Sequence, residues 1–118
     1  MRSPLQTRDI ARVAEFFDGS RQAAFAFARD TWIPETIATL RRLRVAAHAK
    51  SADVPFLCDH LREGARVVGA GSIIALADAL GVQCSNGQWG PMIPTVDKGL
   101  RHALAIGRWL NMQCRSVA

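Results

Sequence analysis

Residues 54–70 read VPFLCDHLREGARVVGA, and apolar residues recur in this stretch at the spacing of an α-helix. They stand four, three, four and three positions apart, at Val54, Cys58, Leu61, Ala65 and Val68. This spacing places them along one side of a helix, as packing against other helices requires. Asp53 is a suitable N-cap, and Pro55 is tolerated in a first turn. The stretch therefore predicts a helix over about 54–68 with one buried stripe.

The remaining side of this helix carries charged residues. The same geometry turns Asp59, Arg62, Glu63 and Arg66 away from the apolar stripe and toward solvent. His60 falls on the flank, on the side of Gly64. The stripe thus fixes which residues a partner could reach.

Four further segments read as helices. They cover about residues 8–17 with Thr7 as cap, 21–50, 72–80 ending before Gly81, and 96–112 with Thr95 as cap. Residues 82–95, VQCSNGQWGPMIPT, contain glycines, prolines and an Asn-Gly pair, and we expect them to form a loop. No segment alternates with period two for long enough to predict a strand. The expected fold is a single all-α domain over residues 1–118, an up-and-down four-helix bundle with an additional short N-terminal helix.

Pro34 divides the longest of these segments and leaves two interpretations open. A proline inside a helix removes one backbone hydrogen bond and usually bends the helix. The segment could instead be two helices, with Asp30 or Thr31 capping the second and Pro34 in its first turn. We favour one long kinked helix.

The composition narrows the class of protein. A chain of 118 residues with 49% hydrophobic residues fits one folded domain. The net charge of +5 would suit nucleic acid, anionic lipid or an acidic protein surface. However, no run of five like charges exists, and the cluster Arg41, Arg42 and Arg44 is interpreted as a solvated helix face.

The sequence also indicates where the protein acts. No run of about 18 apolar residues is present, and the N-terminus has no apolar signal segment, so we expect no membrane insertion and a cytoplasmic location. Three cysteines without a C-x-x-C pair fit a reducing compartment. No hydrolase, oxidoreductase or metal-binding motif is recognisable, and we expect no cofactor.

Residues 21–81 resemble a histidine-containing phosphotransfer (HPt) domain. That family is a helical bundle that exposes a phosphoryl-accepting histidine in the motif H-x-L-K-G, followed by small residues and a terminal G-A. Leu61 and Arg62 occupy the L-K positions here, and Gly69-Ala70 match the G-A. Ile73 then takes the apolar position that opens the next helix. The resemblance implies a role in two-component phosphorelay signalling, with a response-regulator receiver domain or a histidine kinase as partner.

The chain departs from the family motif at two positions. Asp59 stands in the phosphoacceptor position, and Glu63 stands where the motif has glycine. Asp59 supplies no imidazole nitrogen, and Glu63 adds bulk and negative charge. Arginines nearby remain suited to an acidic partner surface. The resemblance therefore implies a protein that docks its partner through Arg62, Glu63, Gly64 and Arg66 but transfers phosphate poorly.

Sliding the motif by one residue would make His60 the acceptor and Gly64 the glycine. Arg62 and Arg66 would then enter the apolar stripe, and burying two unpaired guanidiniums is costly, so we favour the register with Asp59.

Three interpretations of His60 stay open: an ordinary flank histidine, a shifted phosphoacceptor turned outward, or a metal ligand beside Cys58. Other functions also stay open, namely an active phosphocarrier that uses His60, a basic helical module that binds nucleic acid or an acidic protein, and a homodimer.

Overall fold

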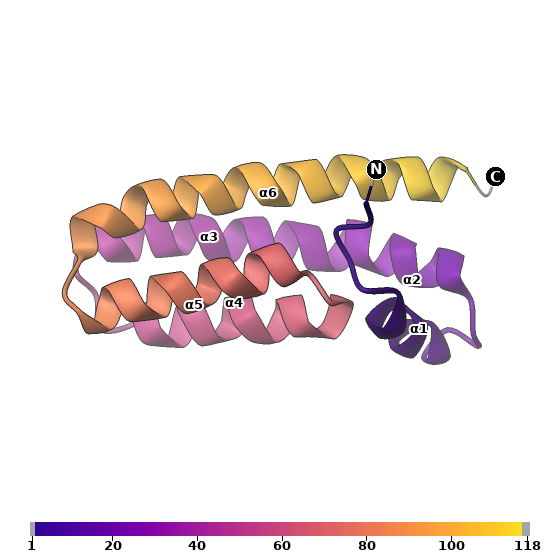
Figure 1. Cartoon of the computed structure of the whole chain (residues 1–118), viewed down its shortest axis with the longest axis horizontal. Helices are drawn as coiled ribbons and strands as arrows, with labels where there is room; N and C mark the ends of the chain where they lie inside the picture. The colour runs from indigo at the N-terminus through magenta and orange to yellow at the C-terminus, as the bar shows by residue number, and fades with distance from the viewer. Residues whose placement is uncertain (1, 117–118) are drawn as a thin grey trace.

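The computed structural model describes residues 2–116, and all of its regular structure is helical (Figure 1). The elements in chain order are α1 (Thr7–Glu15), α2 (Arg21–Phe27), the π-helical turn η1 (Ala28–Trp32), α3 (Ile33–His48), α4 (Val54–Val68), α5 (Gly71–Ser85) and α6 (Trp89–Arg115). No strand occurs among the described residues. The prediction of an all-α fold is confirmed.

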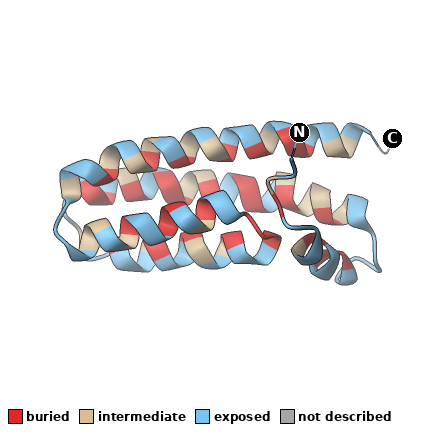
Figure 2. Cartoon of the chain, in the orientation of Figure 1, coloured by how far each residue is buried: buried red, intermediate tan, exposed pale blue. Residues whose placement is uncertain are grey.

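Helices α3, α4, α5 and α6 lie side by side around one core (Figure 1). Helix α3 packs against α4 and α6, and α5 packs against the same two helices. Helix α6 is the longest and reaches α2, while α1 packs against α2 and α4. The buried residues lie on the sides of these helices that face one another, and exposed residues lie on the outer sides (Figure 2).

The apolar stripe predicted for α4 is confirmed at every position. Its members Val54, Cys58, Leu61, Ala65 and Val68 are all buried. Helix α4 also has the predicted bounds. The helical period of the sequence was sufficient here because Pro55 lies in the first turn, where proline is tolerated, and Gly64 lies outside the buried stripe.

The segment 21–48 forms one continuous helical path, as the favoured interpretation predicted. It widens into the π-helical turn η1 just before Pro34, which lies in the first turn of α3. Because proline has no N–H to donate, a local change of hydrogen-bond register is expected there. Neither η1 nor α3 has a side-chain cap, and Asp30 pairs with Arg29 instead, with 2.7 Å between Oδ1 and Nε.

The prediction of a loop over residues 82–95 is wrong. Helix α5 continues through Gly81 to Ser85, α6 begins at Trp89, and residues 86–88 alone connect them. Met92 and Val96 are fully buried, so core packing overrides the local glycine and proline content. Thr95 is therefore not a cap but lies inside α6, where its hydroxyl donates to the Pro91 carbonyl at 3.2 Å.

The expected helix caps were also wrong in detail. Helix α1 begins at Thr7 itself, so this residue does not precede the helix. Asp53 precedes α4, but its side chain makes no capping hydrogen bond. Ser20, not foreseen as a cap, accepts a hydrogen bond from the Ala23 N–H at 3.1 Å and opens α2.

Gly69 ends α4 in a left-handed conformation, with φ of 69°. Its carbonyl accepts a hydrogen bond from the Gln6 N–H at 3.0 Å. A Cβ at this position would lie 2.6 Å from the Gln6 Cβ and 2.5 Å from Asp9 Oδ2. The glycine is therefore needed both for the backbone turn and for the close approach of the N-terminal segment.

Candidate functional site

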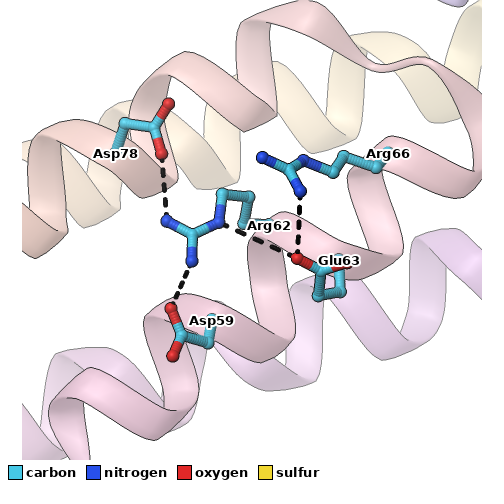
Figure 3. Close-up of polar contacts among 5 residues, drawn as sticks. All are labelled: Asp59, Arg62, Glu63, Arg66 and Asp78. Atoms are coloured by element: carbon cyan, nitrogen blue, oxygen red, sulfur yellow. Dashed lines mark hydrogen bonds and ion pairs between the residues drawn. The ribbon is translucent and has the colours of Figure 1, made fainter.

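Arg62 lies at the centre of an ion-pair network that joins α4 to α5 (Figure 3). Its Nη2 is 2.5 Å from Oδ1 of Asp59, and its Nη1 is 3.2 Å from Oδ1 of Asp78. The hydrogen bond with Asp78 is the main cause that raises the pKa of Arg62 above its usual value, so the guanidinium stays charged. The carboxylate of Asp59 is thus already engaged by a cation.

Three of the four residues expected to face solvent do so. Asp59, Glu63 and Arg66 are exposed, whereas the Arg62 side chain is only 29% exposed because it lies between the two helices. Glu63 pairs with Arg66 at 3.3 Å between Oε1 and Nη1 (Figure 3). The outer side of α4 therefore presents two neighbouring acid–base pairs.

His60 faces α3, whereas Arg62 faces α5. Its Nε2 lies 3.0 Å from Oε1 of Glu35 on α3, within hydrogen-bond distance. Its ring stacks on Phe56, with 6.5 Å between centroids and 11° between planes. The side chain remains 48% exposed, so the imidazole is held in place yet accessible.

Gly64 stands one turn after His60, above the buried indole of Trp32. A Cβ on Gly64 would lie 3.5 Å from the Trp32 Nε1, which is an ordinary contact. Helix packing therefore does not require glycine at this position, although glycine inside a helix is less stable than alanine by about 1 kcal/mol. The Trp32 Nε1 is buried and has no hydrogen-bond partner among the described residues.

The metal-ligand interpretation of His60 gains no support from the geometry. Cys58 is buried in the core, whereas His60 is half exposed on another side of α4. Among residues 2–116 no group of three or more His, Cys, Asp or Glu side chains is placed to hold a metal ion. Burial is the main cause that raises the pKa of the Cys58 thiol to about 11, which favours the protonated form over the thiolate that metals bind.

The arginine cluster of α3 separates into two environments. Arg44 reaches across to α6, where its Nε lies 2.9 Å from Oδ1 of Asp97. Arg41 and Arg42 are exposed and have no ion-pair partner within residues 2–116. They line a groove with Phe56, an aromatic residue that stands outside the buried stripe of α4.

Sequence reasoning missed the partners of the site residues. Glu35 and Asp78 lie on other helices, and no sequence pattern links them to His60 or Arg62. Phe56 was detectable, because a large aromatic side chain outside the apolar stripe has to face solvent or a partner.

No described helix is long and apolar enough to cross a membrane. Comparisons of the chain with protein families, with curated proteins and with solved structures found no significant match.

Proposed function

We propose that the protein is an HPt-like module of two-component signalling. It docks a response-regulator receiver domain or a histidine kinase through the outer side of α4 and relays phosphoryl groups poorly. The observation that carries this proposal is the place of Asp59, which is exposed on α4 in the acceptor position of the motif and paired with Arg62. The side-by-side packing of α3 to α6 supports the up-and-down four-helix bundle that the resemblance implies.

The chemistry of the acceptor position explains the expected loss of transfer. A phosphorelay between histidine and aspartate needs an exposed imidazole nitrogen that can approach the phosphorus in line. Asp59 offers a carboxylate instead, and that carboxylate lies against the Arg62 guanidinium. Glu63 adds a second negative charge one turn away, and it repels a phosphoryl group.

The surroundings of the site still suit docking. Arg66 is exposed beside Glu63 and can pair with acidic residues of a partner. Gly64 has no side chain that would project from α4, although helix packing would accept a larger residue at this position. A partner can therefore come close to α4 even though the acceptor has changed.

A second candidate function is phosphate carriage by His60. The observation in its favour is the accessible imidazole, held by Glu35 and followed one turn later by Gly64. Because Nε2 is engaged by Glu35, transfer to that nitrogen requires this hydrogen bond to open. A carrier function would therefore depend on His60 and not on Asp59.

Binding is the first test. Purified wild-type protein is titrated against a panel of receiver domains and histidine kinases, beside Gly64→Gln and Arg66→Glu on α4. Arg108→Glu, at an exposed position on α6, is the matched control for the loss of a surface charge. We expect both α4 variants to weaken binding by about tenfold or more and the control to leave it unchanged. No binding across the panel, or equal loss in all three variants, contradicts the proposal.

Phosphoryl transfer separates the two candidates. Phosphorylated kinases and receivers are offered to wild type, His60→Ala and Asp59→His, and the label on each is followed. Little label on wild type, with label gained by Asp59→His, supports a docking module that has lost its acceptor. Label on wild type that His60→Ala abolishes identifies His60 as the carrier instead.

A further inference from the structure

A groove lies between the C-terminal half of α3 and the first turns of α4. Its volume is about 740 Å³, within the range of about 300–1,000 Å³ typical of ligand sites. The residues used below, Arg41, Arg42, Val45, Asp53, Phe56 and Leu57, all line it. It is separate from the ion-pair network of Arg62, which faces α5.

The floor of the groove is apolar and uncovered. Val45 on α3 and Phe56 on α4 are each 71% exposed, although both are large hydrophobic residues. Leu57 also lines the groove and is partly buried against the core. Apolar side chains that converge from two helices form a continuous patch, and such patches mark binding sites more often than isolated exposed residues do.

The charge around this floor is predominantly positive. Arg41 and Arg42 both line the groove and pair with no acidic residue among residues 2–116. By contrast, their neighbour Arg44 is held by Asp97. Asp53 is the one acidic residue in the lining. Two unpaired guanidiniums beside an apolar floor are complementary to carboxylates attached to apolar groups.

We propose that this groove binds a short, acidic, amphipathic segment of another protein. One or two large apolar side chains of that segment pack between Val45 and Phe56, and its carboxylates pair with Arg41 and Arg42. Recognition of a helix or an extended segment in a groove commonly combines apolar anchors with charges at the edge. The inference does not depend on the proposed two-component function, because the groove between α3 and α4 contains none of the residues proposed for docking, Arg62, Glu63, Gly64 and Arg66.

Charge decides against a second copy of the chain as the occupant. A two-fold interface centred on the groove would bring two copies of Arg41 and two of Arg42 into one apolar patch. Partly desolvated like charges are costly, and the chain itself carries a net charge of +5. Nucleic acid would use the arginines, but its phosphates gain nothing from Val45 and Phe56.

The first test selects peptides of about 15 residues from a random library for binding to the folded 118-residue chain. Selected peptides are synthesised and titrated by fluorescence anisotropy. We expect acidic peptides with apolar residues at helical or alternating spacing, whose affinity falls as salt rises. A neutral or basic consensus, or no selected peptide, overturns the proposal.

Variants then locate the bound peptide. Arg41→Glu combined with Arg42→Glu, Val45→Glu and Phe56→Ala should each raise the Kd by about tenfold or more. Leu104→Ala and Arg108→Glu alter exposed residues of α6 and serve as controls, which should stay within about twofold. All altered residues are exposed, and circular dichroism checks that each variant is folded. Binding that resists the groove variants, or a dimer that Val45→Glu dissociates, contradicts the proposal.

Discussion

His60 and Asp59 are adjacent in the chain but pair with side chains on different sides of α4. The imidazole of His60 lies 3.0 Å from Glu35 on α3, whereas Asp59 is bound by Arg62, which continues to Asp78 on α5. The two registers considered for the proposed phosphotransfer motif therefore correspond to two different sides of α4. For this reason, single substitutions at these two positions can separate a docking module from a phosphate carrier.

Replacing Gly69 with alanine should destabilise the protein by about 1–3 kcal/mol. The backbone is left-handed there, and the new Cβ would collide with the side chains of Gln6 and Asp9. Urea unfolding followed by circular dichroism measures the change. Gly71→Ala is the control, since a Cβ at Gly71 meets nothing within 4 Å. Equal stability of the two variants would contradict the role assigned to Gly69.

Two glycines of α6 should respond in opposite directions. A Cβ at Gly107 would meet only Ile33 at 3.7 Å, so Gly107→Ala should stabilise the protein by about 0.5–1 kcal/mol through helix propensity. A Cβ at Gly99 would lie 2.9 Å from side-chain atoms of Leu40 and Leu76. Gly99→Val should therefore cost about 1–3 kcal/mol by overpacking. The free energy of unfolding of each variant checks this, and a stabilising Gly99→Val would refute the packing of α6 against α3 and α5.

Cys58 should react much more slowly with thiol reagents than the other two cysteines. Burial raises the pKa of its thiol to about 11, so at about pH 8 only about one thousandth of it is thiolate. Cys84 and Cys114 are partly exposed. Titration of the folded protein with Ellman's reagent should show two faster thiols and one slow thiol, and Cys58→Ala should remove the slow phase. A rapid reaction of all three in the folded protein would show that Cys58 is not buried.

The pair of Arg44 and Asp97 should make part of the stability depend on pH. Its hydrogen bond is the main cause that lowers the pKa of Asp97 below its usual value of 3.8. A carboxyl whose pKa is lower in the folded state contributes stability above the unfolded pKa, and this contribution is lost as the pH falls through the folded pKa. The wild type should therefore be more stable than Asp97→Asn at about pH 7, and the difference should be smaller at about pH 2.

The control for that measurement is Asp30→Asn. Asp30 also has a lowered pKa, but its partner Arg29 is the adjacent residue of the same helical segment. Of these two carboxylates, Asp97 is the one that joins different helices, because it pairs with Arg44 of α3 from its place on α6. Replacing Asp97 should therefore also lower the resistance to urea at neutral pH more than Asp30→Asn does. If the difference between wild type and Asp97→Asn were the same at both pH values, the ion pair would not contribute to stability.

The local sequence pattern was sufficient to predict helix α4 and the all-α class of the fold. Apolar residues at helical spacing determine which side of α4 is buried, because that side alone can leave water when helices pack. The same reasoning correctly anticipated one continuous helical path through Pro34. In each case the deciding interactions lie within a few residues of one another in the chain.

The remaining features depend on contacts between distant segments. Burial of Met92 and Val96 converts the expected loop 82–95 into helix, and this gain cannot be read from the glycines and prolines nearby. Gly69 is required because residues 6 and 9 lie against it. The pairing of His60 with Glu35 and the groove between α3 and α4 likewise join residues far apart in sequence. Periodicity defines the face of a helix, but which side chains meet across two faces is set by how the helices pack around the shared core.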